Sequence, residues 1–183
     1  MYACVETVPL EATERRPEFC REVEPLRPDE ARAVHCHQSL DGVSSTFAHW
    51  PNGHGRLEYS FRKPTKMCGM TVFSSPLRSD QPLYDISIFV NGSAVPLRNE
   101  FTSRAVDGSR PRHHTVRQLD GYAVSGVSIS GASQFSSQQG GVALSFKFSK
   151  CVTGRTVSLK KRTHKAGWSN DAWWISDLRV DQS

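Results

Sequence analysis

The chain has 183 residues, a formal net charge of +5, 37% hydrophobic residues and 22% charged residues. This length suits one compact domain, or one domain with a tail, and the hydrophobic content is too high for a globally disordered chain. Since no run of about 18 apolar residues occurs, we expect no membrane-spanning helix. The first residues also lack the basic and apolar pattern of a signal peptide.

Acidic and basic side chains are distributed unevenly along the chain. Residues 1–40 contain eight acidic residues, five arginines and several prolines, whereas the remainder is strongly basic. This composition predicts an acidic, Pro-rich leader or wrap-around arm over 1–40, with one short helical turn at 28–34, followed by a single domain over 41–183. Either the leader lies on the basic body, or the body uses its positive surface on another partner.

From about residue 41 onward, apolar and polar residues alternate with the period of two that is typical of β-strands. Leu57, Tyr59 and Phe61 show the pattern clearly, and Asn91-Gly92 predicts a tight hairpin. In chain order, we expect strands near 43–48, 56–62, 66–74, 84–91, 93–97, 113–118, 122–130, 142–149, 155–161 and 172–180. Short strands without intervening helices predict an all-β fold, an antiparallel two-sheet β-sandwich of the jelly-roll type with an extended N-terminal arm.

The cysteines are widely and irregularly spaced. They are Cys4, Cys20, Cys36, Cys68 and Cys151, and the absence of a C-x-x-C pair argues against zinc-ribbon and thioredoxin motifs. Two disulfides plus one free thiol are expected if the protein is exported, and the spacing leaves the pairing open. The sequence His35-Cys36-His37 has no second ligand pair at a suitable spacing, so we expect neither a metal site nor a cofactor.

Motifs of known enzymes are missing from the sequence. There is no G-x-S-x-G nucleophile elbow, no glycine-rich phosphate loop and no H-E-x-x-H pattern. We therefore expect a protein without catalytic activity. A hydrolase whose active site lies in unrecognised loops remains the alternative.

Tryptophans in polar turns are the main candidates for ligand binding. Trp50 and Trp168 are each followed two residues later by an asparagine, and a sugar site combines a stacking ring with short polar groups. The predicted site residues are Trp50, Asn52, His54, Trp168, Asn170 and Trp173. The alternative is that these tryptophans pack in the core or plug loops.

Two basic clusters form a second set of candidates. They comprise Arg110, Arg112, His113, His114 and Arg117, together with Lys160, Lys161, Arg162 and Lys165. Such clusters attract sulfated glycans, acidic lipids or nucleic acids through screened electrostatics, and the alternative is a solvated loop. No RRM, KH or helix-turn-helix pattern accompanies them, which argues against sequence-specific recognition of nucleic acid. Asn91 begins an Asn-Gly-Ser glycosylation sequon.

Two segments resemble known extracellular modules. Residues 167–180, with the run Trp173-Trp174-Ile175-Ser176-Asp177, look like the closing strand of MAM and protease-associated jelly rolls. Residues 56–72 resemble a strand pair of discoidin or galactose-binding-like domains. Ser176 stands where the MAM pattern usually has Asp, so the resemblance gives no support to a structural calcium site.

The resemblance implies a non-catalytic binding module of a secreted or surface protein that recognises a glycan or a partner protein. A galectin-like sandwich is a third relative, although the sugar motifs His-x-Asn-x-Arg and Trp-x-x-Glu-x-Arg of galectins are absent. A galectin-like adaptor that binds an adhesin is therefore a further alternative, as is an intracellular, cytoplasmic scaffold with reduced thiols. The oligomeric state is left open.

Overall fold

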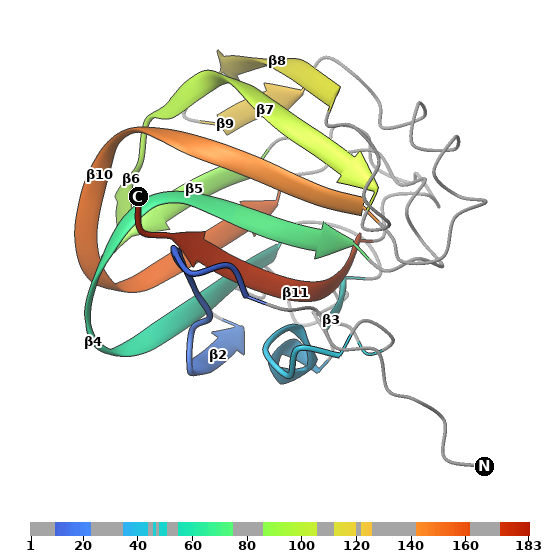
Figure 1. The fold of residues 1–183 in the computed structure, drawn as a ribbon, viewed down its shortest axis with the longest axis vertical. Coiled ribbons are helices and arrows are strands. Elements are labelled where there is room, and N and C mark those ends of the chain that lie inside the picture. Colours follow the sequence, from blue (N-terminus) through green and yellow to red (C-terminus); the bar gives the residue numbers. More distant parts are fainter. Residues whose placement is uncertain are drawn as a thin grey trace.

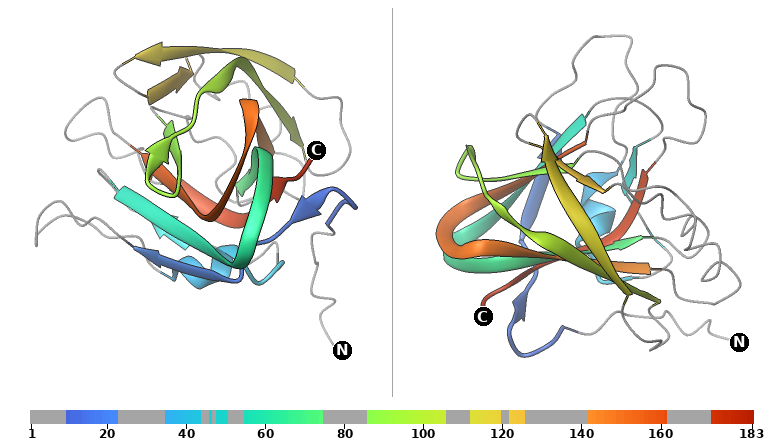
Figure 2. Two further views of the ribbon diagram at one scale, coloured as in Figure 1. Left: turned by 90° about the vertical axis from the view of Figure 1, so that its left-hand side faces the viewer. Right: turned by 90° about the horizontal axis from the view of Figure 1, so that it is seen from above.

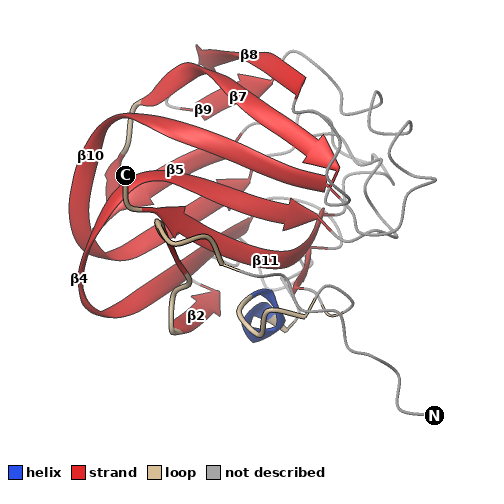
Figure 3. Cartoon of the chain, in the orientation of Figure 1, coloured by secondary structure: helices blue, strands red, loops and turns tan. Residues whose placement is uncertain are grey.

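The computed structural model describes residues 10–22, 35–43, 46, 48–50, 55–74, 86–105, 112–119, 122–125, 142–161 and 173–183. The elements are β1 (Glu14–Arg15), β2 (Phe19–Glu22), the 3-10 helix η1 (Cys36–Ser39), β3 (Ala48–Trp50), β4 (Gly55–Ser74), β5 (Ile86–Val90), β6 (Ser93–Ala94), β7 (Leu97–Ala105), β8 (Arg112–Leu119), β9 (Tyr122–Ser125), β10 (Val142–Lys161) and β11 (Trp173–Asp181). The predicted all-β fold is confirmed, and Figure 3 shows strands nearly throughout the described chain. The helical turn expected at 28–34 lies outside the described residues.

Two long, bent strands build both layers of the sandwich. β4 and β10 each contain 20 residues, pair with each other antiparallel along their length, and turn back on themselves at the same place (Figure 1). Their register is interrupted between Lys147 and Val152 and again between Gly154 and Thr156. The sequence predicted two separate strands in each case, and this was wrong because irregular pairing lets one strand bend sharply without ending.

The halves of these strands belong to different sheets. The front sheet consists of β1, β3, β11, the second half of β4, the first half of β10, β7 and β8. The back sheet consists of β2, the first half of β4, the second half of β10, β5 and β6. β9 pairs with both β8 and β5, so it links the two layers along one side. Figure 2 shows the layers from two further directions.

The hydrophobic core lies between these sheets. From the front sheet, Leu144 and Leu178 flank Val72 in register, and all three are at most 1% exposed. From the back sheet, Leu57 and Ile88 flank Leu159 in the same manner, again at most 1% exposed. Each buried large aliphatic side chain contributes about 1.5–3 kcal/mol through removal of apolar surface from water. The predicted alternation at residue 57 and beyond is thus confirmed as the inward face of a strand.

The predicted hairpin at Asn91-Gly92 is also confirmed. Val90 pairs with Ser93, and the φ angles of Asn91 and Gly92 are 48° and 80°. Asparagine and glycine tolerate this left-handed conformation, which two-residue hairpin turns with the right twist require. The Asn91 side-chain oxygen accepts hydrogen bonds from the backbone N–H groups of Arg155 at 3.0 Å and Thr156 at 3.2 Å. The hairpin is therefore fastened to the bend of β10.

Gly154 allows this close approach, and its replacement provides a test. A Cβ atom at this position would lie 2.6 Å from Val90 Cγ1 and 2.9 Å from Asn91 Oδ1. Because the hairpin would have to move, we expect Gly154→Ala to lower the free energy of unfolding by about 1–3 kcal/mol in urea denaturation. Thr153→Ala, at the exposed neighbouring position, is the control and should change it by less than about 0.5 kcal/mol. Equal midpoints for the two variants would show that the hairpin shifts without cost.

Candidate ligand-binding site

Strand ends that flank several connecting segments lie together at one end of the sandwich, which we call the loop end. Val142 pairs with Ser74 and Ala105 there, while Lys161 pairs with Gly55 and Ile86. The connections 51–54, 75–85, 106–111, 126–141 and 162–172 each begin or end at this end. Binding residues are disproportionately carried by loops that a rigid scaffold positions, so the loop end is the natural place for a site. The bends of β4 and β10 lie at the opposite end (Figure 1).

Two of the predicted site residues are neighbours at the loop end. Trp50 is the last residue of β3, Trp173 is the first residue of β11, and the two are direct register partners in the antiparallel ladder. Although 123 positions separate them in the sequence, strand pairing brings their backbones together. The remaining predicted sugar-site residues, Asn52, His54, Trp168 and Asn170, lie outside the described residues.

The basic candidates fall on two strands. Arg112, His113, His114 and Arg117 belong to β8, at the edge of the front sheet beside β7. Lys160 and Lys161 end β10 in the back sheet, where Lys160 pairs with Arg56 and with Ser87. Arg112 and Lys161 both lie toward the loop end, but in different layers. Arg110, Arg162 and Lys165 lie outside the described residues.

A buried ion network joins the described residues of the predicted N-terminal arm, 10–22 and 35–40, to the front sheet. Asp177 is fully buried on β11, and its carboxylate accepts hydrogen bonds from Arg16 Nε at 2.8 Å and Arg16 Nη2 at 3.0 Å. Arg179 Nη2 donates to the same carboxylate at 2.6 Å, and Arg179 Nη1 lies 3.2 Å from Glu14 Oε1. The hydrogen bond to Asp177 raises the pKa of Arg16, outweighing the opposite effect of burial.

Further contacts fasten the arm to the back sheet. β2 pairs with β4 of the back sheet, and a disulfide between Cys20 and Cys36 ties β2 to η1 within the arm. The Tyr59 hydroxyl lies 2.9 Å from Ser39 Oγ, and Ser39 Oγ donates to the Cys36 carbonyl at 2.5 Å. Burial raises the pKa of Tyr59 well above its ordinary value, so the phenol stays neutral. These described N-terminal residues therefore pack against both sheets.

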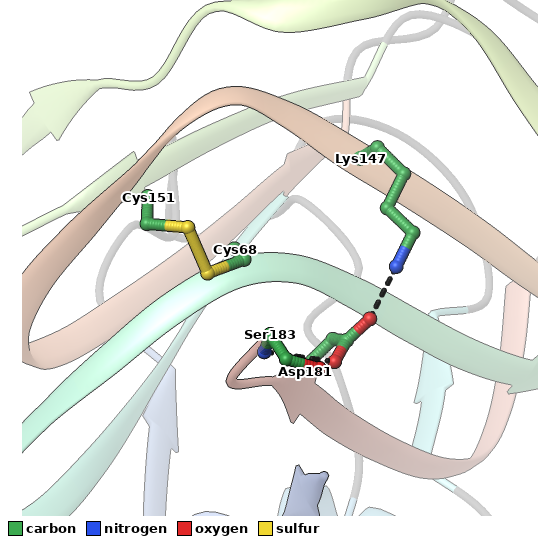
Figure 4. Close-up of a disulfide and its surroundings, with 5 residues drawn as sticks. All are labelled: Cys68, Lys147, Cys151, Asp181 and Ser183. Carbon is green, nitrogen blue, oxygen red and sulfur yellow. Dashed lines mark hydrogen bonds and ion pairs between the residues drawn. A yellow bond between two sulfur atoms is a disulfide. The ribbon is translucent and has the colours of Figure 1, made fainter.

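A shallow polar groove crosses the outer face of the front sheet, with a volume of about 280 Å³. Its floor includes Thr71 and Ser145, whose hydroxyl oxygens are 2.9 Å apart. Glu14, Lys147 and Asp181 stand around it, and Lys147 forms an ion pair with Asp181 (Figure 4). Hydroxyls and carboxylates of this kind hydrogen-bond polar ligands, but two of these carboxylates are engaged by Arg179 and Lys147. Those two carboxylates are therefore less available to a ligand in the groove.

Several side chains that attracted notice in the sequence have structural partners. Cys36 forms a disulfide with Cys20, so His35-Cys36-His37 offers no free thiolate as a metal ligand. Ser176 Oγ donates to the Phe73 carbonyl at 3.1 Å, and the neighbouring carboxylate of Asp177 binds guanidinium groups. Within the described ranges, no group of three or more His, Cys, Asp or Glu residues is placed to hold a metal ion. Those ranges also contain no helix of sufficient length and hydropathy to cross a membrane.

The sequence analysis did not identify Glu14, Arg16, Asp177 and Arg179 as a unit. An Arg-x-Asp or Asp-x-Arg spacing on a strand places both side chains on one face, and this was the available signal in Asp177-Leu178-Arg179. That the face is covered by the N-terminal arm depends on tertiary structure. The arm contributes two members of the network from more than 160 residues away in sequence.

No protein-family model and no curated protein matches the chain. Among solved structures, chitosan-binding module 1 of a chitosanase/glucanase from Paenibacillus sp. IK-5 is similar over 89% of this chain and 92% of that one, with a TM-score of 0.50 and 10% identity. The CBM32 of AlyQ in complex with 4,5-unsaturated mannuronic acid gives a TM-score of 0.48 and 12% identity over 93% and 98% of the chains. A mutant of the lectin binding domain of Lectinolysin complexed with Lewis b gives a TM-score of 0.49 and 12% identity over 98% of this chain and 99% of that one.

At these identities the likeness concerns the fold. The antiparallel sandwich agrees with the predicted β-sandwich fold, although residues 56–72, which resemble a strand pair, lie in the single strand β4. The chain thus has a β-sandwich fold similar to that of chitosan-binding module 1.

Proposed function

We propose that this chain is a non-catalytic glycan-binding module of a secreted or surface protein, with its sugar site at the loop end. The observation that carries the proposal is the register pairing of Trp50 with Trp173 beside the connecting segments 51–54 and 162–172. Two tryptophans at adjacent positions offer stacking surface for the apolar faces of a sugar, and polar loop residues bond its hydroxyls. Asn52, His54, Trp168 and Asn170 belong to those connecting segments.

Binding rather than catalysis is supported by how the described reactive groups are used. Cys20, Cys36, Cys68 and Cys151 are in disulfides and are not available as nucleophiles. Asp177 is committed to two arginines. Disulfides persist in oxidising compartments, which supports export of the chain. A protein ligand at the same end is the competing partner.

Trp50→Ala and Trp173→Ala are expected to weaken glycan binding at least tenfold, because each removes a stacking surface. The measurement is a glycan array followed by titration of the strongest hit with the intact chain. Phe19→Ala is the matched control, since Phe19 is 52% exposed on β2 and distant in the fold from the loop end. It should bind as the unmodified protein does, and circular dichroism should be unchanged for all three variants.

Two outcomes would contradict the proposal. One is full glycan binding by both folded tryptophan variants. The other is an array without hits combined with specific capture of a protein partner that the tryptophan variants lose, which would assign the loop end to protein recognition instead.

A further inference from the structure

The end of the sandwich opposite the loop end carries a second feature, formed by the bends of β4 and β10. In the ladder between β4 and β10, Thr65 pairs with Gly154, and the next pair is Ser60 with Thr156. Residues 61–64 of β4 therefore lie opposite a single residue of β10, Arg155. Residues 148–151 of β10 lie opposite Cys68 in a second irregularity. Figures 1 and 2 show both strands curving round together at this end.

Exposed cations gather at these bends. Five of them form what we call the bend-end basic surface, namely Lys63, Lys66, Arg98, Lys150 and Arg155. Lys66 on β4 is the register partner of Thr153 on β10. Arg98 follows Leu97 on β7, and Leu97 pairs with Phe148 on β10. The pairing of β4, β10 and β7 therefore brings these positions to the same end of the sandwich. None of the five cations forms an ion pair with another residue in the described ranges.

Acidic neighbours do not neutralise this surface within the described chain. Glu18 is the carboxylate that reaches toward it, and this side chain binds Arg15 at 3.0 Å and the backbone N–H of Arg62 at 3.0 Å. Those bonds hold the pKa of Glu18 below its ordinary value even though partial burial acts in the opposite direction. The positive charge of the bend-end basic surface therefore remains available to a partner.

The backbone beneath these cations is rigidly held. The disulfide between Cys68 and Cys151 joins the two bends (Figure 4). In the sequence, Lys150 is adjacent to Cys151, and Lys66 is two positions from Cys68. On the other side, Asn91 bonds the backbone at Arg155. Cations whose spacing is fixed lose less conformational freedom when they bind a charged polymer.

We infer that the bend-end basic surface binds an anionic polysaccharide, one that carries sulfate or uronate groups at regular intervals. Its charge complements such a chain. The exposed large hydrophobic side chains of the described chain are Leu10 and Phe19. Phe19 lies near the surface, on β2 opposite Ser60, and the Arg62 guanidinium lies over its ring, so a single ring and not a continuous apolar face is available there for insertion into a lipid layer. Export, which the disulfides support, exposes the surface to extracellular acidic polysaccharides rather than to intracellular nucleic acid.

This site is separate from the proposed sugar site and does not require it. Since the two ends are opposite, one molecule can engage a glycan at the loop end while the bend end holds an acidic chain. Two simultaneous contacts raise the overall avidity without new interactions within either site.

The test uses heparin as the sulfated probe and neutral dextran as the uncharged one, with binding measured by titration at 50 mM and 500 mM NaCl. We expect heparin but not dextran to bind, and the affinity to fall steeply with salt because exposed charges are screened. In the triple variant Lys63→Gln, Lys66→Gln and Lys150→Gln, heparin affinity should fall about tenfold or more. The matched control is Lys161→Gln, Arg162→Gln and Lys165→Gln, which removes the same number of charges from the basic cluster predicted at 160–165 and should retain most of the affinity.

Several results would overturn the inference. Equal losses in both triple variants would mean that net charge alone attracts heparin, and absence of heparin binding at 50 mM NaCl would remove the site altogether. Tighter binding to a DNA duplex or to anionic phospholipid vesicles than to heparin would assign the surface to that polyanion instead. Binding of the array-selected glycan by the bend-end variant reports on the loop end separately, so the two proposals can fail independently.

Discussion

Asp177→Ala is expected to lower the free energy of unfolding by about 3–5 kcal/mol, because it leaves buried guanidinium charge without its carboxylate. The Asp177 side chain is 1% exposed and that of Arg179 is 2% exposed, so water cannot replace the lost partner. Arg16 is held by two hydrogen bonds to the same group. Chemical denaturation followed by tryptophan fluorescence measures the change, and hydrogen exchange over residues 10–22 should show loosening of the N-terminal arm.

Asp181→Ala is the matched control for this prediction. Asp181 lies four residues further along the chain and pairs with Lys147, whose side chain is 48% exposed. Surface pairs of this kind contribute at most about 1 kcal/mol. A second control adds Arg16→Ala to Asp177→Ala, where we expect little further loss since Arg16 has already lost this partner. If Asp177→Ala and Asp181→Ala destabilise equally, the network is not what secures the arm.

Loss of the Cys68–Cys151 disulfide, in the double variant Cys68→Ser and Cys151→Ser, is expected to cost about 4–5 kcal/mol. The bond closes a segment of 83 residues, and its main effect is to restrict the unfolded chain. The Cys20–Cys36 bond spans 16 residues, so the corresponding variant should lose about 3 kcal/mol. Urea denaturation of both variants gives the comparison.

The order of these two effects is the discriminating result. If removal of the shorter link destabilises more, then the local support that the Cys20–Cys36 bond gives to β2 and η1 outweighs chain entropy. Thiol counting under denaturing, non-reducing conditions provides a direct check of the pairing, because one free thiol, that of Cys4, is expected among the five cysteines. Five free thiols would contradict both the pairing and the proposal of export.

The sequence predicted the strands well where burial imposes a period of two. Leu57 and Tyr59 on β4 and Leu144 and Phe146 on β10 are buried at alternate positions, as the pattern indicated. The bends were not predicted, because Pro64 and its neighbours have the composition of a turn. Pro64 falls where the β4 register is irregular, so its missing N–H removes no regular ladder hydrogen bond.

The buried ion network of Asp177 and Arg179 was not predicted from the sequence. A charged residue in an alternating strand indicates a solvated face, and Asp177 and Arg179 do lie on the side of β11 away from the core. Only the position of the arm, which carries Glu14 and Arg16 over that face, makes it dry. The cysteine pairing escaped prediction for the same reason, since it depends on which strands meet. The pairing of Trp50 with Trp173 likewise follows from topology and not from either local segment.

The sharing of β4 and β10 between the two sheets has a mechanical consequence. Neither sheet can separate from the other and stay folded, because β4 and β10 contribute strands to both sheets. Unfolding of such a domain is expected to be all-or-none. Partly unfolded states that expose unpaired strand edges are then seldom populated. A protein of this kind is expected to aggregate less readily than one whose two sheets could open independently.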